Sequence, residues 1–283
     1  MNRGRWGANA VGVVLLTALL SACGVFGGGE SRLQSLDGMP AEQILSQGES
    51  ALEVDRDYER AVHYFSELER LYPYSAWAQR GLVMQAYAYH RMRDYEDSRA
   101  AAQRYLDLFP AADDAAYAQY LLALSYYDQI EEVGRDQGLT FDALEALQVV
   151  FEQYPDSEFA RTAEMQFDLA FDHLAAKEME VGRFYLKRGH YAAASNRFRN
   201  VVESFETSTH TPEALHRLAE AYMALGLTDE AQTAGAILGH NFRGNEFYGD
   251  TYRLLTGAGL APEAAGEGWL RDVYRRTVRG EWL

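Results

Sequence analysis

A block of residues that is stated twice constrains the fold of this 283-residue chain more than any other feature. The first copy, from Tyr58 to Pro73, reads YERAVHYFSELERLYP, and the second, from Tyr95 to Pro110, reads YEDSRAAAQRYLDLFP, so the interval between Tyr58 and Tyr95 is 37 residues. Fixed periods of this size are typical of stacked helical hairpins, because one hairpin cannot bury its apolar face without a neighbour. The sequence therefore predicts an array of helical hairpins.

The same frame of small and apolar residues continues downstream of these two copies. Its positions are Ala61, Phe65 and Leu68; Ser98, Ala102 and Tyr105; Ala143, Leu147 and Val150; Ala194, Phe198 and Val201; and Ala231, Gly235 and Leu238. The third copy ends in Pro155, whereas Glu206 and Arg243 stand where a proline would close the last two. We expect the second helix of each hairpin to begin at Tyr58, Tyr95, Thr140, Tyr191 and Thr228.

Two insertions make the spacing uneven. The first insertion is a loop around Gly134 to Gly138, before the third copy. The second insertion lengthens the stretch from about Arg161 to Arg188, before the fourth copy. That stretch is predicted to be one long helix that enters the fourth hairpin. The array is then expected to consist of two groups of hairpins joined stiffly by this helix.

The spacing resembles the tetratricopeptide repeat, whose first helix carries a small residue and a tyrosine three positions later. The matching pairs here are Ala86/Tyr89, Ala123/Tyr126, Gly182/Tyr185 and Ala219/Tyr222, and the earliest repeat places Glu49/Leu52 there. Small residues let two helices approach closely, and the aromatic side chains fill the groove to the next repeat. The resemblance implies an all-α fold, a tetratricopeptide-repeat helical-hairpin solenoid of about five repeats over residues 39–255.

The N-terminal residues have the features of a bacterial lipoprotein signal peptide. Residues 1–22 contain Arg3 and Arg5 before an apolar stretch that is too short to span a bilayer. They end in Leu20-Ser21-Ala22, and Cys23 follows, which matches the bacterial lipobox. Cys23 is the only cysteine, so it cannot form an internal disulfide. An ordinary cleaved signal with a chance cysteine is the alternative.

We therefore expect Cys23 to carry a covalent N-acyl and S-diacylglycerol lipid, which anchors the chain to a membrane because several acyl chains give stable binding. Residues 23–38 are glycine-rich and predict a flexible tether. In bacterial lipoproteins of this type an Asp after the cysteine favours the inner membrane. Gly24 follows here, so that rule implies the periplasmic face of the outer membrane.

Residues 256–283 form a linker rich in Gly and Ala, followed by an amphipathic helix. Trp269, Leu270, Val273 and Tyr274 share one face of that helix, and several arginines surround them. Two interpretations remain open. The helix caps the apolar face of the last repeat, or it docks a partner or a lipid headgroup surface.

The sequence offers little support for catalysis or for nucleic-acid binding. The formal charge of −16 repels phosphate groups. The seven histidines show no HExxH spacing, and no phosphate-binding glycine loop or GxSxG motif is present. We expect no cofactor beyond the lipid, no metal, and no enzymatic activity.

Peptide binding is a more plausible function than catalysis. In a tetratricopeptide array the first helix of each hairpin lines the concave face, and the residues predicted to point into it are Arg80, Tyr87, Tyr117, Tyr120 and Tyr127. Aromatic side chains with one arginine could hold a segment that ends in aromatic residues, by stacking and apolar burial. The alternative is that these tyrosines pack between repeats, and both can be partly true.

With a lipobox, a tether and five such repeats in this order, the chain resembles the BamD family, the lipoproteins of the outer-membrane β-barrel assembly machine. The resemblance is strongest at 71–75, 100–110 and 185–191, and at Asn196, Arg197 and Phe198. It implies a non-enzymatic scaffold that assists assembly and insertion of β-barrel proteins. Its partners would be unfolded barrel precursors, the periplasmic domains of a BamA-like barrel subunit, and other lipoproteins of the machine.

Arg197 lies inside a matching motif, so it is the candidate for coupling the repeats to the barrel subunit. A structural ion pair on the second helix of repeat 4 is the alternative. A different function also remains open for the whole chain: a periplasmic repeat lipoprotein that coordinates cell-envelope or peptidoglycan processes.

Overall fold

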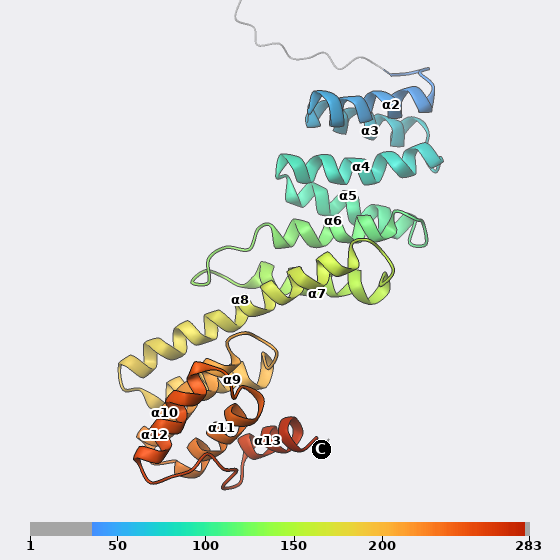
Figure 1. Ribbon diagram of the computed structural model, residues 1–283. Helices are drawn as coiled ribbons and strands as arrows, with labels where there is room; N and C mark the ends of the chain where they lie inside the picture. Colours follow the sequence, from blue (N-terminus) through green and yellow to red (C-terminus); the bar gives the residue numbers. More distant parts are fainter. Residues whose placement is uncertain (1–35, 281–283) are drawn as a thin grey trace, which may run out of the picture. The chain divides into compact units, whose positions relative to one another are not determined.

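The computed structural model describes residues 36–280 (Figure 1). The contacts divide the chain into two compact units, 1–40 and 41–283, and every described helix lies in the second. The predicted signal peptide, the lipid site Cys23 and most of the predicted tether lie outside the described residues.

The second unit consists of helices joined by short turns and a few loops. In chain order they are α2 (Ala41–Ser50), the π-helix η1 (Ala51–Asp55), α3 (Tyr58–Leu71), α4 (Ala76–Met92), α5 (Tyr95–Leu108), α6 (Ala115–Tyr127), α7 (Gly138–Gln153), α8 (Ala160–Lys187), α9 (Tyr191–Ser204), α10 (Thr211–Leu225), α11 (Thr228–Asn241), α12 (Glu246–Gly257) and α13 (Trp269–Arg279). Residues 36–280 contain no strand. The predicted all-α class is confirmed.

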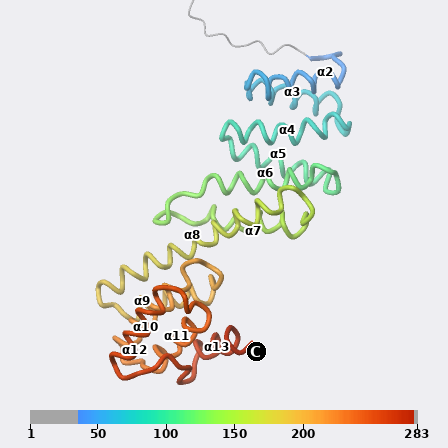
Figure 2. Tube along the Cα trace, in the orientation of Figure 1, coloured from blue at the N-terminus to red at the C-terminus, as the bar shows by residue number. Residues whose placement is uncertain are grey.

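From α2 to α11 each α-helix packs against the α-helix that follows it in the chain, so neighbours in sequence are neighbours in space (Figure 2). The hairpins are α2 and α3, α4 and α5, α6 and α7, α8 and α9, and α10 and α11. After them α12 packs on α10 and α11, and α13 packs on α11. This is the predicted helical-hairpin solenoid of about five repeats.

The repeat frame forms the core. Every frame position of the five second helices is buried, from Ala61 in α3 to Leu238 in α11. The small residues Ala86, Ala123, Gly182 and Ala219 of the first helices are buried as well. The first hairpin departs from the prediction, because the residue that faces Phe65 is Gly48 and not Glu49. The π-helix η1 lies between α2 and Tyr58, and its wider turn shifts by one residue the position on α2 that faces Phe65.

All five second helices end in the same way. The cap residues are aromatic, and each donates its backbone N–H to the carbonyl four residues earlier; they are Tyr72, Phe109, Tyr154, Phe205 and Phe242. Each also accepts a backbone N–H from the residue three positions later. Glu206 and Arg243 therefore permit the same turn as the prolines at the equivalent positions. The residue type that all five turns share is the aromatic cap residue.

The two insertions appear as predicted. The first is the loop 128–137 between α6 and α7, and the second makes α8, with 28 residues, the longest described helix. The second helix of the third hairpin begins at Gly138, two residues before the predicted Thr140, while the other four begin at the predicted residues.

Candidate functional site

The structure brings three of the five groove candidates together. The rings of Tyr87 on α4 and Tyr117 on α6 lie with their centroids 6.5 Å apart. Tyr117 and Tyr120 both stack on Phe159, which immediately precedes α8, at centroid distances of 5.1 and 5.2 Å. Four aromatic rings from three consecutive hairpins therefore form one continuous surface, which we call the aromatic surface.

The aromatic surface is half-buried, so its rings pack between repeats and also keep part of their area accessible, which leaves both predicted roles open. Burial raises the pKa of Tyr117 far above its usual value and raises that of Tyr120 as well, so both phenols stay neutral. Arg91 donates a 2.8 Å hydrogen bond to the Tyr87 hydroxyl and also lies over the Tyr58 ring. This arginine supplies positive charge at one end of the rings.

Arg80 and Tyr127 do not join this surface as predicted. Arg80 donates to Glu49 of α2 at 2.7 Å, and that hydrogen bond is the main reason why its pKa is raised. Tyr127, at the last residue of α6, lines a separate cavity with Ile130 and Leu169. Arg80 is engaged with α2 and Tyr127 with this separate cavity, so neither residue belongs to the aromatic surface.

Phe159 is the residue that the sequence reasoning missed. It stands four residues after Pro155, the same distance at which Trp77 follows Pro73. An aromatic residue at this offset was the available signal. Helical spacing along α8 does not reveal Phe159, because this residue lies just before the helix begins.

Arg197 lies on α9 at the rim of a cavity of about 460 Å³. Its Nη1 is 3.2 Å from the carboxylate of Glu178 on α8. The cavity is lined mostly by polar side chains: Glu178, Tyr185, Asn196, Arg197, Arg199, Asn200 and Glu203, together with Ala193. Arg197 is therefore ion-paired and also remains half-exposed toward an open polar cavity, so the structure accommodates both predicted roles.

A buried histidine joins α10 to α12. His216 is 5% exposed, and its Nδ1 lies 2.9 Å from the Thr251 hydroxyl. That hydroxyl donates to the Phe247 carbonyl oxygen, so Nδ1 carries the proton that Thr251 accepts. The other ring nitrogen faces Glu220 at 3.5 Å.

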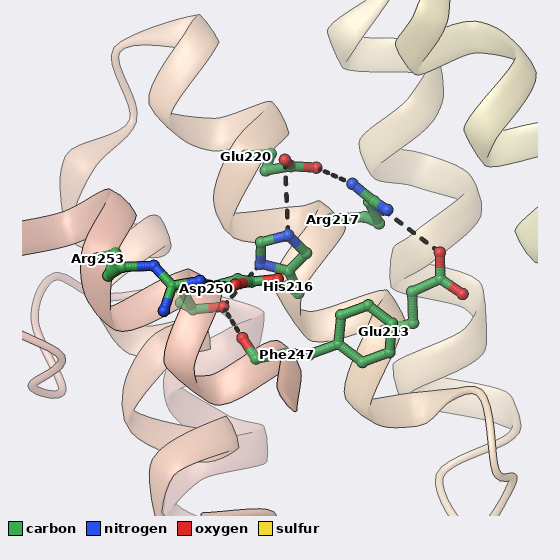
Figure 3. A network of polar contacts seen from close by, with 8 residues as sticks. Glu213, His216, Arg217, Glu220, Phe247, Asp250 and Arg253 are labelled. Atoms are coloured by element: carbon green, nitrogen blue, oxygen red, sulfur yellow. Dashed lines mark hydrogen bonds and ion pairs between the residues drawn. The ribbon is translucent and has the colours of Figure 1, made fainter. Parts of the chain in front are cut away.

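Figure 3 shows how this histidine continues into a chain of ion pairs. Arg217 donates to Glu220 at 2.8 Å and to Glu213 at 3.3 Å, and Arg183 of α8 donates to Glu213 at 2.9 Å. The hydrogen bond from His216, together with Arg217, lowers the pKa of Glu220 to about 2. The network holds three helices together, and its residues serve structure.

The tail helix α13 covers α11. Leu270 and Val273 are buried, the Trp269 indole N–H points to the Tyr222 hydroxyl at 3.3 Å, and Arg199 lies 4.7 Å above the Trp269 ring. These contacts are those of a cap on the last hairpin.

Two negative findings concern the described residues. Within 36–280 no group of three or more His, Cys, Asp or Glu side chains could hold a metal ion. In the same range no helix combines the length and the apolar character that crossing a membrane requires.

The chain is similar to proteins that carry a functional name. The family model described as "YfiO: Outer membrane lipoprotein" matches residues 37–237. A protein of Caulobacter vibrioides named outer membrane protein assembly factor BamD is 41% identical over 276 residues, which is 96% of this chain and 88% of the relative. A protein of Rickettsia prowazekii with the same name is 38% identical over 242 residues, 85% of this chain and 96% of the relative.

Solved structures show more distant likenesses. The tetratricopeptide domain of P58(IPK) is 14% identical, with a TM-score of 0.38, and the match covers 76% of this chain and 55% of that one. A tetratricopeptide protein of Thermus thermophilus is 18% identical, with a TM-score of 0.37, over 75% of this chain and 98% of that one.

The family model matches residues 37–237. This range contains the aromatic surface, the cavity at Arg197 and the five hairpins except for the last few residues of α11. On that match and on the two relatives, the chain belongs to the YfiO family of outer membrane lipoproteins, the family of the BamD assembly factors.

Proposed function

We propose that this chain is a non-enzymatic lipoprotein scaffold that assists the assembly and insertion of β-barrel proteins into the outer membrane. The observation that carries the proposal is the 41% identity, over 96% of the chain, to a relative named outer membrane protein assembly factor. Stacked hairpins supply what a scaffold needs, because each repeat adds surface without requiring a closed active site. The lipid on Cys23 would hold these surfaces at the periplasmic face of the outer membrane.

The polar cavity at Arg197 is the proposed contact for the periplasmic domains of a BamA-like barrel subunit. Arg197 keeps about half of its side chain exposed while it pairs with Glu178. Such an exposed pair contributes little to folding, on the order of 0–1 kcal/mol, so the guanidinium is available to a partner at small cost. Other lipoproteins of the machine are proposed as further partners, without an assigned surface.

The aromatic surface is the proposed contact for unfolded barrel precursors. Three tyrosines and Phe159 offer stacking faces, and Arg91 offers a cation for a terminal carboxylate. Burial of the rings between repeats preorganises them, which lowers the entropy cost of binding.

The test is co-purification from detergent-solubilised membranes. The proposal predicts that a large barrel protein with periplasmic domains is retained with the chain, and that Arg197→Ala reduces its recovery. Glu178→Ala is the matched control, because it breaks the same ion pair and leaves the guanidinium free. If both variants lose the partner equally, or if the barrel protein is absent with the unsubstituted chain, the proposed coupling is wrong.

A further inference from the structure

The two insertions that break the repeat period meet in space. The loop 128–137 is attached to α8, the lengthened helix, by two side chains. Lys177 Nζ donates to the Gly134 carbonyl oxygen at 2.8 Å, and His173 Nδ1 lies 3.1 Å from Gln137 Oε1. The insertions therefore form one preorganised structure, which regular hairpins would not have.

This structure lines an open cavity of about 340 Å³, which is the size of small binding pockets in proteins. Its lining is mainly apolar, with one carboxylate and one imidazole: Tyr127, Ile130, Glu131, Leu169, Ala170 and His173. The cavity is distinct from the aromatic surface and from the cavity at Arg197.

An exposed apolar row on α8 leads into the cavity. Met165 is 52% exposed and Leu169 is 61% exposed, and the two stand one helical turn apart on the same face. Single exposed apolar residues are ordinary, but two in a row beside an apolar cavity form a face that water covers poorly. A helix that presents apolar residues at the same spacing would match this face.

The charge around the row is acidic. Glu164 and Asp168 form a second exposed row beside it, and Glu132 lies on the attached loop. None of these three carboxylates has an ion-pair partner within residues 36–280. Arg135, a neighbouring cation on the loop, pairs with Glu131 instead. Arg161, one turn before Glu164, is the one exposed cation on this part of α8. The surface is complementary to a basic segment.

We propose that the cavity and the row of Met165 and Leu169 form a docking site for a partner polypeptide, specifically an amphipathic helix with an apolar anchor side chain and flanking Lys or Arg residues. The anchor enters the cavity beside Leu169, and the cations face Glu164 and Asp168. This site goes beyond the proposed function, which does not use it.

The experiment measures binding of a synthetic 16-residue helical peptide, with leucines on one face and lysines flanking it, to the purified full-length chain. Fluorescence anisotropy at physiological salt should show saturable binding. Leu169→Gln should weaken it at least tenfold, and Glu164→Lys with Asp168→Lys should do the same. Phe141→Gln is the matched control, because Phe141 is an equally exposed apolar side chain on α7, and it should leave binding unchanged. Thermal unfolding should be unchanged in all these variants, since the altered side chains are exposed.

Two further peptides and one hydrodynamic measurement complete the test. A peptide with Glu in place of Lys should bind at least tenfold more weakly, and a scrambled peptide should not bind saturably. Absence of binding by the Lys peptide, equal binding by the scrambled one, or equal affinity for Leu169→Gln would overturn the proposal. Sedimentation that shows a dimer of the chain abolished by Leu169→Gln would assign the face to a second copy and overturn it as well.

Discussion

Two glycines set how closely the helices of the first and fourth hairpins approach. A Cβ atom on Gly48 would lie 2.5 Å from the Phe65 ring, and one on Gly182 would lie 2.4 Å from the Phe198 ring. Phe65 and Phe198 hold the same place in the repeat frame, so the two hairpins use one packing solution. A large ring on the second helix requires a residue without a side chain on the first.

Gly182→Ala should therefore lower the free energy of unfolding. Overpacking a core typically costs about 1–3 kcal/mol, and the higher helix propensity of alanine returns up to about 1 kcal/mol, so we expect a net loss of about 1–2 kcal/mol. Chemical denaturation measures it. Gly249→Ala on α12 is the control, since its Cβ would meet only Arg253 Nη1 at 3.8 Å, and it should stabilise. Equal effects at both positions would contradict the packing role of Gly182.

Three first helices end in a left-handed residue, and one of the three is not glycine. Arg93 has φ of 64°, whereas Gly189 and Gly226 have φ of 75° and 76°. In each case the next residue donates its backbone N–H to the backbone carbonyl oxygen of the repeat tyrosine of the first helix, which is Tyr89, Tyr185 or Tyr222.

Arg93→Gly should stabilise the protein by about 0.5–1 kcal/mol. The left-handed conformation costs a side-chain-bearing residue about 1–2 kcal/mol, and the greater freedom of glycine in the unfolded chain removes part of the gain. The measurement is again the free energy of unfolding. Gly226→Ala should move it in the opposite direction by about 1 kcal/mol, and a stabilising Gly226→Ala would show that backbone strain is not what separates the sites.

Glu220 should make stability depend on pH in the acidic range. Its pKa is lowered from 4.5 to about 2, so its contribution is complete above pH 4.5 and is lost as the pH falls from 4.5 toward 2. Partial exposure screens the interaction, so we expect Glu220→Gln to cost about 1–2 kcal/mol at pH 7. Unfolding measured from pH 7 to pH 2 should show the difference from the unsubstituted protein vanish at the acidic end. A difference that persists at pH 2 would contradict this assignment.

At the scale of helices, the frame allowed most of the array to be predicted. Four second helices begin at the predicted residue because each is preceded by a tight turn, and the buried frame residues recur at fixed offsets. Gly138 begins α7 earlier than predicted, because the inserted loop frees its start from the turn that fixes the others. The π-helix η1 similarly shifted the frame glycine Gly48 of the first hairpin, and a local change in helix type leaves no periodic signal.

The site was predictable only in part, for a related reason. Helical spacing placed Tyr87, Tyr117 and Tyr120 near one another, and their rings do share one surface. Spacing could not find Phe159, which lies outside the helix, and it could not show that Tyr127 would turn to the cavity beside loop 128–137. The contacts of an insertion depend on where and how it interrupts the repeat. The repeat pattern carries no information about either.

The tail helix α13 gives a prediction about its role as a cap. Leu270 is 2% exposed against α11, so Leu270→Ala should cost about 3 kcal/mol locally. In a repeat array a terminal loss acts first on its neighbour, so hydrogen exchange should accelerate in α11 before α3. Asp272→Ala, on the exposed face of α13, should change exchange little. Unaltered exchange in α11 with Leu270→Ala would favour the docking interpretation over the cap.

For the whole molecule, family membership and the fold lead to the same account. The chain belongs to the YfiO outer membrane lipoprotein family, and its stacked hairpins present an aromatic surface, a polar cavity at Arg197 and the site between the insertions. These surfaces share the helices α6 and α8 but are lined by different residues. Separate surfaces on one array let a scaffold hold several polypeptides at once, and binding of two modules on one chain raises their effective concentration.

The most direct measurement of the central claim is the amount of folded β-barrel protein in the outer membrane while this chain is depleted from its own cell. We predict that barrel proteins decline in that fraction, that the unsubstituted chain restores them, and that Cys23→Ala, which removes the proposed lipid anchor, restores them poorly. Undiminished barrel proteins after depletion would contradict the account.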